Sequence, residues 1–380
     1  MSELLVEVIR GDRVESRHRG SLAVVTPSGK LIASLGDPDE FIFIRSAAKP
    51  FQLAPFVASG RFDAYDFPGP TEALAVMAGS HSGEDRHVRT VAAVLRAGGL
   101  TREVLACGVA TPSDVETAQR LARDGEPPAA IRHNCSGKHA GMALHAKAAG
   151  WPIETYWQPD HPVQQLAVQT ISTLSGTPIS EMATGTDGCG AVTVGLPLRA
   201  LALAFARLAD PSSVEDAALR GALERIRDAM MAHPEMVAGE RREFDTSLMR
   251  AAPGRLVAKW GAEGVQGVGL LAGSRGAGSG AAGSGTTGSG AAGSGATGRG
   301  ALGFALKIED GDRARRARPA ATVEALRQLG VLDPEALARL ADYAAPRILD
   351  PRGEVAGEVR PAFSQLRSTP ASRGSRRRGG

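Results

Sequence analysis

The sequence predicts an α+β fold of the α/β sandwich kind, with a mainly antiparallel sheet built from both chain ends and flanked by helices. Short segments with the pattern of strands lie before residue 45 and again after residue 252. Between about residues 46 and 251 the apolar residues recur at helical spacing instead. Strands at both ends with helices between them indicate one sheet assembled from the two termini.

Each strand is expected where an apolar run is bounded by turn residues. Pro27-Ser28-Gly29-Lys30 separates two such runs and predicts a hairpin. The expected strands cover residues 22–26, 31–35, 41–44, 256–260, 265–271 and 301–308. The expected helices cover residues 72–78, 86–97, 138–149, 163–173, 198–208 and 214–231.

Residues 1–366 are expected to form one catalytic domain. Its sheet part is expected at about residues 1–45 and 252–366, and its helical part at about 46–251. A Gly-Ser-Gly repeat with a period of five residues interrupts the chain at residues 273–300. Such a repeat has no large side chains to bury and much backbone entropy to lose, so it predicts a flexible loop insertion between neighbouring strands.

Composition narrows the class of protein. Residues 367–380 carry five arginines and no acid, and predict a disordered basic tail. Those arginines exceed the net charge of +3, so the body is close to neutral and nucleic-acid binding is not expected. The sequence contains no run of about 18 apolar residues, so we expect no membrane-spanning helix. The acidic N-terminus does not resemble an export signal, and three cysteines are too few for a disulfide framework, so we expect a cytoplasmic protein.

Lysine is scarce in this chain, since only six of its 44 basic residues are Lys. Positions that keep Lys against this background indicate a need for an amine that can lose its proton, which Arg cannot do. Lys49 closes the tetrad Ser46-Ala-Ala-Lys49, and Lys259 opens Lys259-Trp260-Gly261. A Ser three residues before a Lys is typical of serine acyl hydrolases that use the amine as base, although an isolated Ser-x-x-Lys is common.

Ser46 is expected to begin a helix, in which Ser46 and Lys49 share one face and can meet. The helix start would also supply N–H groups for an oxyanion. Burial and the charge of Lys259 would lower the pKa of Lys49 into the range of an effective base. Ser80 lies in the loop Ser80-His81-Ser82-Gly83 and is expected to border the same cleft. The alternative interpretation of that loop is a turn that caps the next helix.

Two further loops concentrate nucleophilic and metal-ligating side chains. One places Cys135, Lys138 and His139 at the start of a helix, and the other carries Asp187 and Cys189 among glycines. Two cysteines from separate loops and one more donor can hold a zinc ion. The spacing is not Cys-x-x-Cys, so buried thiols that act only as small apolar groups are the alternative.

Six segments occur in a fixed order and together resemble the asparaginase II family, the rhizobial-type L-asparaginases. Each motif alone is weak, but six in order are specific, and the resemblance runs from about residue 5 to residue 365. The segments are Ser46-Ala-Ala-Lys49-Pro50, Ser80-His81-Ser82, Asn134-Cys135-Ser136-Gly137-Lys138-His139, Thr186-Asp187-Gly188-Cys189, His233-Pro234-Glu235-Met236-Val237-Ala238-Gly239-Glu240 and Lys307-Ile308-Glu309-Asp310-Gly311.

The resemblance implies a homodimer that hydrolyses L-asparagine to L-aspartate and ammonia, on a fold similar to serine β-lactamases and penicillin-binding proteins. It also implies a zinc ion that orients the substrate and organises the loops rather than activating water. The residues that it assigns are the catalytic pairs Ser46 with Lys49 and Ser80 with Lys259, the zinc ligands Cys135, Lys138 and Cys189, and the substrate contacts Asp187, His139, Arg45 and Gly188.

The expected mechanism is acyl transfer, in which Ser46, deprotonated by Lys49, attacks the side-chain amide, and Lys259 with Ser80 relays a proton to departing ammonia. Ser80 is the alternative nucleophile. The rival functions are a penicillin-recognising serine hydrolase or esterase, a catalytically degenerate binding relative, and hydrolysis by zinc hydroxide. The preference for asparagine over glutamine rests on one methylene, worth about 1–3 kcal/mol, and does not follow from the sequence.

Overall fold

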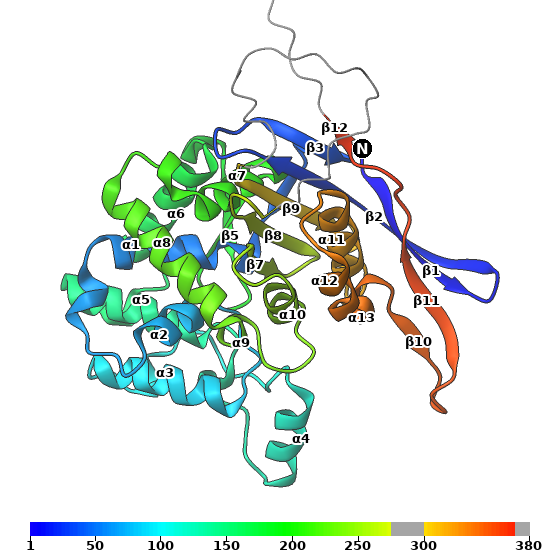
Figure 1. Cartoon of the computed structure of the whole chain (residues 1–380). Coiled ribbons are helices and arrows are strands. Elements are labelled where there is room, and N and C mark those ends of the chain that lie inside the picture. The colour runs from blue at the N-terminus through cyan, green and yellow to red at the C-terminus, as the bar shows by residue number, and fades with distance from the viewer. Residues whose placement is uncertain (275–299, 369–380) are drawn as a thin grey trace, which may run out of the picture.

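The computed structural model describes residues 1–274 and 300–368, in which strands from both chain ends form one large sheet. The strands are β1 (Glu3–Arg10), β2 (Arg13–Val25), β3 (Leu31–Leu35), β7 (Leu256–Gly261), β8 (Val265–Leu270), β9 (Leu302–Ile308), β10 (Arg347–Leu349), β11 (Val355–Pro361) and β12 (Arg367–Ser368). Their order is β10–β11–β1–β2–β9–β8–β7, with β3 beside β2 and β12 beside β3 (Figure 1). The pairings are antiparallel, which confirms the predicted α+β fold.

A smaller antiparallel sheet has the order β4–β6–β5 and positions part of the site. Its strands are β4 (Phe41–Phe43), β5 (Ala183–Thr186) and β6 (Val192–Pro197). Strands β5 and β6 lie within the region predicted to be helical. The turn that joins them is closed by a hydrogen bond from the Gly190 N–H to the Asp187 carbonyl at 2.9 Å, and Gly190 has a φ of 84°.

The six predicted helices are present as α2, α3, α5, α6, α7 and α8, with ends that differ by up to three residues. Helix α8 begins later than expected because the Asp216 carboxylate accepts the N–H groups of Ala218 and Leu219 and so caps it. The helices are α1 (Lys49–Ala58), α2 (Pro70–Met77), α3 (Asp85–Ala97), α4 (Val115–Arg123), α5 (Ser136–Ala149), α6 (Pro162–Ser175), α7 (Leu198–Ala209), α8 (Ala217–Ala232), α9 (Pro234–Val237), α10 (Phe244–Ala251), α11 (Ala317–Gln328), α12 (Pro334–Arg339) and α13 (Ala341–Ala344).

Helices α7 and α11 cover opposite faces of the large sheet. Side chains alternate between faces along a strand, and on β8 a Cβ added to Gly267 would meet the Phe205 ring of α7. The neighbouring Gln266 side chain instead accepts a hydrogen bond from Arg318 of α11. The helices of the middle region gather on the side away from the β1–β2 and β10–β11 hairpins (Figure 1). One cluster of buried apolar residues, from Leu5 to Leu366, joins sheet and helices.

The predicted insertion and the predicted tail lie mostly outside the residues that the structure describes. Residues 275–299 of the expected insertion and residues 369–380 of the expected tail lie outside them. Arg367 and Ser368, at the start of the expected tail, pair with Ser34 and Ala33 as β12, so regular structure extends two residues past the predicted boundary. Within residues 1–274 and 300–368, no helix is long and apolar enough to cross a membrane.

The contact between α7 and the sheet depends on glycine. A Cβ added at Gly303 of β9 would overlap the Ala202 carbonyl oxygen of α7, so the helix or strand must shift in Gly303→Ala. We expect a loss of roughly 1–3 kcal/mol in the free energy of unfolding, measured by urea titration. The control is Gly221→Ala in α8, where a Cβ meets nothing within 4 Å and helix propensity predicts a gain of up to about 1 kcal/mol. Equal effects of the two changes would contradict the account.

Candidate active site

Ser46 and Lys49 lie where the small sheet leads into α1. A single 3₁₀ turn, η1 (Arg45–Ala48), holds Ser46, and α1 begins at Lys49. The backbone of β7 packs directly on this turn, since a Cβ added at Gly261 would lie 2.6 Å from the carbonyl oxygen of Ile44, the residue before the turn. Lys259, two residues earlier on β7, is thereby brought to the same region.

Lys49 is buried and its amine is held by three oxygen atoms. The Nζ lies 2.7 Å from the Ser80 Oγ, and it donates to two backbone carbonyls, those of Gly79 at 2.7 Å and Asn134 at 3.1 Å. Burial lowers the pKa of Lys49, and this outweighs the opposite effect of Cys135. The amine is therefore easier to deprotonate than an exposed lysine.

The two serines are paired differently from the sequence prediction. Ser46 is 7% exposed, and its hydroxyl makes no hydrogen bond within residues 1–274 and 300–368. The expected contact between Ser46 and Lys49 is not formed, because Ser80 and the two carbonyls occupy the Lys49 amine. The expected contact between Ser80 and Lys259 is also not formed, because the Lys259 Nζ donates to the Trp260 carbonyl at 2.7 Å.

Lys259 is fully buried on β7, with its Nζ 5.0 Å from the centre of the Trp260 ring. Burial, and next the charge of Lys49, lower the pKa of Lys259 to about 7. The Asp245 carboxylate accepts the Trp260 N–H at 2.7 Å and a Gln266 side-chain N–H at 3.0 Å, which fixes the backbone beside this amine. The site thus contains two buried lysines, and the charge of Lys49 favours the neutral form of Lys259.

Arg45 and Asp187 form an ion pair at the rim of the site. The Arg45 Nε donates to the Asp187 Oδ1 at 2.6 Å, and the two side chains are 24% and 9% exposed. Arg45 has a φ of 49°, a left-handed conformation that costs a non-glycine residue on the order of 1 kcal/mol. Gly188 faces the same arginine, since an added Cβ would lie 3.8 Å from its Nη2. The structure therefore brings the predicted Arg45, Asp187 and Gly188 together.

The predicted zinc ligands also converge. Sulfur and oxygen atoms of Cys135, Asp187 and Cys189 lie within 4.8 Å of one another, and the Lys138 Nζ lies 3.0 Å from the Cys189 Sγ. These spacings and the two thiols fit a zinc ion. The neighbouring Cys189 lowers the pKa of Cys135 well below its usual value, although burial opposes this. The Cys189 thiol itself donates to the Asp187 Oδ2 at 3.6 Å. Burial lowers the pKa of Lys138, but the neighbouring Cys189 and Cys135 raise it more, so the pKa is above its usual value. Ligation by Lys138 would therefore require the metal to displace its proton.

His139 of α5 is fully buried and lies beside this cluster. Its Nδ1 is 2.7 Å from the Tyr156 hydroxyl, and its Nε2 has no hydrogen-bond partner among the described residues. Burial lowers the pKa of His139 to about 4, although the nearby Cys189 thiol acts in the opposite direction. The ring is therefore neutral at physiological pH.

A model of one protein family, described as L-asparaginase II, matches residues 6–361 of this sequence. The chain belongs to that family. Membership indicates an amidohydrolase of the asparaginase type and agrees with the resemblance drawn from the six sequence motifs. A comparison with curated proteins finds no match.

Solved structures of Mglu are distantly similar to this L-asparaginase II family member. One is described as "Crystal Structure Analysis of Mglu", with 15% identity, a TM-score of 0.33, and coverage of 84% of this chain and 69% of that one. Another is Mglu "in its tris and glutamate form", with 14% identity, a TM-score of 0.32, and coverage of 84% and 61% respectively.

Several groups of the site were missed by sequence reasoning. The carbonyls of Gly79 and Asn134 are backbone atoms, so no residue type signals their contact with Lys49. Tyr156 lies outside every motif that we identified. Asp245 follows the motif that ends at Glu240, and its buried position could only be inferred from the apolar residues around it.

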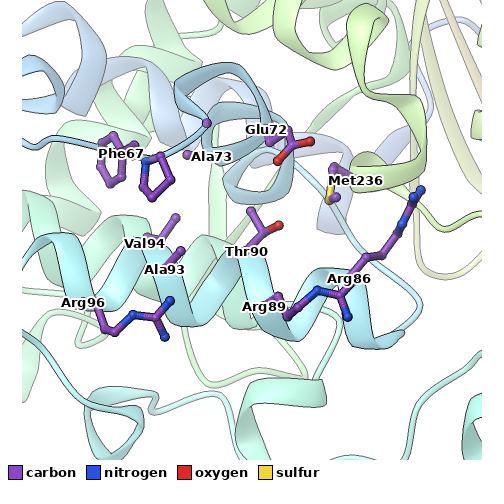
Figure 2. A pocket seen from close by; sticks show the side chains of 12 residues that line it. Phe67, Glu72, Ala73, Arg86, Arg89, Thr90, Ala93, Val94, Arg96 and Met236 are labelled. Carbon is purple, nitrogen blue, oxygen red and sulfur yellow. The ribbon is translucent and has the colours of Figure 1, made fainter.

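The cavity shown in Figure 2 is separate from this cluster. It has a volume of about 400 Å³ and lies between α2 and α3, with Arg86, Arg89 and Arg96 along α3. No candidate catalytic residue lines it in the described part of the chain. We therefore look for the chemistry at the buried lysine cluster and not at this cavity.

The lowered pKa of Lys259 makes a prediction about stability. Between pH 7 and 10.5 the unfolded chain binds the Lys259 proton and the folded chain does not, so stability rises with pH in that window. Relative to Lys259→Met, which has no such proton, the wild type should gain about 2 kcal/mol of unfolding free energy between pH 7.5 and 9. Urea unfolding at both pH values measures this difference. A constant difference would mean that Lys259 keeps an ordinary pKa.

Proposed function

We propose that this protein is an L-asparaginase in which Lys49 is the base and Ser80 is the nucleophile. The observation that carries the proposal is the arrangement around the Lys49 amine. Two of its three partners, the carbonyls of Gly79 and Asn134, can only accept hydrogen bonds, whereas the third, the Ser80 hydroxyl, can also donate.

The three groups around the Lys49 Nζ match the hydrogen-bonding groups of a neutral amine. A neutral amine has two N–H groups and one lone pair. If the two N–H groups of Lys49 bind the two carbonyls, the lone pair is left for the proton of the Ser80 hydroxyl, at 2.7 Å. A serine whose proton is accepted in this way becomes an effective nucleophile. Burial, which lowers the pKa of Lys49, supports the neutral form.

The reaction then follows in two acyl-transfer steps. The Ser80 Oγ attacks the side-chain amide carbon of asparagine while its proton passes to Lys49. The tetrahedral intermediate collapses as that proton moves to the departing nitrogen, which leaves as ammonia. Water, deprotonated by the same amine, attacks the ester and releases aspartate and free Ser80. The Ser80 N–H donates to the Val237 carbonyl at 2.7 Å, so the oxyanion must be stabilised by other groups.

Substrate recognition is proposed for the groups at the rim. An α-ammonium group requires acceptors, and the Asp187 carboxylate keeps its Oδ2 free of Arg45. Arg45 supplies a cation for the α-carboxylate. We further propose that Cys135, Cys189 and Lys138 hold a zinc ion, which would supply a fixed positive charge that organises these loops.

The assignment of the nucleophile is tested by Ser80→Ala and Ser46→Ala. Loss of the attacking hydroxyl should reduce kcat by about 10³-fold or more in Ser80→Ala, since the acyl-enzyme cannot form. Ser46→Ala should keep much more activity. The assay is ammonia release from asparagine, with glutamine and a chromogenic β-lactam as comparison substrates. The opposite pattern would restore Ser46 as nucleophile, and turnover of the β-lactam alone would refute an asparaginase.

The zinc proposal has a matched control in the third buried cysteine. Cys135→Ser and Cys189→Ser should lose zinc that the wild type keeps after dialysis, because thiolate ligands dominate the site. Cys107→Ser should keep it, since the Cys107 thiol bonds the Ala130 carbonyl and is not in the cluster. Metal content is measured by elemental analysis. Retention of zinc by both cluster variants would contradict the assignment.

A further inference from the structure

The cavity between α2 and α3 contains charged side chains that have no partner. Arg89 and Arg96 of α3 line it, and neither side chain makes a hydrogen bond or an ion pair within residues 1–274 and 300–368. Glu72 of α2 lines the opposite side and is likewise unpaired among those residues (Figure 2). Arg86 is already paired, since its Nη1 donates to the Glu240 Oε2 at 2.8 Å. In the described part of the chain, the unpaired charges around the cavity are therefore two positive and one negative.

The two unpaired arginines can act together on one ligand. They are seven residues apart, which is about two helical turns, so they lie on one face of α3 with roughly 10 Å between them along its axis. The charge of Arg89 acts on Asp85, but that carboxylate is hydrogen-bonded to Arg120 and Arg132 instead. An arginine binds a carboxylate through two parallel N–H groups, so each of the two guanidinium groups can hold one carboxylate.

The rest of the lining suits the short hydrocarbon chain of a small ligand. Phe67, Ala73, Val94 and Met236 supply apolar side chains, and Thr90 adds a hydroxyl from α3. A hollow of about 400 Å³ that combines apolar side chains with a few charged groups is typical of a small-molecule site. The alternative interpretation is that the arginines are ordinary solvated side chains. That interpretation predicts no binding, so the test below distinguishes the two.

We propose that this cavity is a binding site for a small acidic amino acid, separate from the catalytic cluster. The two carboxylates would pair with Arg89 and Arg96, and the α-ammonium group with Glu72, so the ligand matches the unpaired charges in number and sign. The apolar side chains would contact its methylene groups. The proposal goes beyond the proposed function and does not depend on it, because no candidate catalytic residue in the described part of the chain lines the cavity.

The test is a titration of ¹³C-methyl-methionine-labelled protein with L-glutamate. The chain has eight methionines, and Met236 lines the cavity, so its methyl signal reports on this site. The signal is assigned by its loss in Met236→Leu. We expect it to shift and to saturate as glutamate is added. A Met236 signal that stays in place, or that moves without saturating, would overturn the proposal and show that the arginines are only solvated.

Two double variants show whether the arginines of the cavity hold the ligand. Arg89→Gln with Arg96→Gln removes both carboxylate partners and should raise the dissociation constant about 10-fold or more. Arg102→Gln with Arg313→Gln removes the same charge from exposed arginines that do not line this cavity, and should leave the dissociation constant unchanged. Equal effects of the two pairs would overturn the site, since they would reflect net charge alone. A shift caused by glutamate at the catalytic cluster would persist in Arg89→Gln with Arg96→Gln, and that result would also overturn it.

Glutarate, which is glutamate with hydrogen in place of the α-amino group, tests the role of Glu72. It should bind the wild type about threefold or more weakly than glutamate, because it brings no ammonium group to the carboxylate. Glu72→Gln should remove this difference. Glutarate that binds the wild type as tightly as glutamate would overturn the assignment to an amino acid. None of these measurements uses catalysis, so a failure of the protein to release ammonia from asparagine would refute the proposed function and leave this site intact.

Discussion

A buried amine held by two carbonyl oxygens is the constraint on which the site depends. Within residues 1–274 and 300–368, Lys49 bonds no carboxylate, and a charged amine without such a partner is costly to bury. The cost falls when the amine is neutral, and the neutral amine then has one lone pair directed at Ser80. Stability and chemistry therefore favour the same protonation state. After burial, the charge of the neighbouring Lys138 also lowers the pKa of Lys49 and adds to this preference.

The fold supplies this arrangement from segments far apart in the sequence. Strand β7, from the C-terminal part of the sheet, packs on the 3₁₀ turn that precedes α1 and brings Lys259 towards Lys49. Ser80 follows the end of α2, and its backbone N–H donates a hydrogen bond to the Val237 carbonyl of α9, which fixes its position. The turn between β5 and β6 of the small sheet carries Asp187 and Cys189, and it places Cys189 beside Lys138 of α5. Membership of the L-asparaginase II family gives this geometry its chemical interpretation.

The sequence predicted most of this arrangement, and its failures have physical reasons. Lysine scarcity pointed to Lys49 and Lys259, and helical spacing then paired Lys49 with Ser46. Spacing fixes which residues share a helix face but not the direction of a long side chain, and Lys49 extends to Ser80 instead. The loop of Ser80 fits both of its interpretations, since Glu84 caps α3 while Ser80 bonds the amine. Backbone carbonyls and Tyr156 have no sequence signature.

The protonation state of Lys49 is the central claim, and the scarcity of lysine makes it measurable. With six lysines, the ε-carbon signals of ¹³C-lysine-labelled protein can be assigned by single substitutions, including Lys49→Met. The account predicts that the Lys49 signal titrates with a midpoint below the ordinary value of 10.5. A midpoint at or above 10.5 would show a permanently charged Lys49 that cannot accept the proton of Ser80.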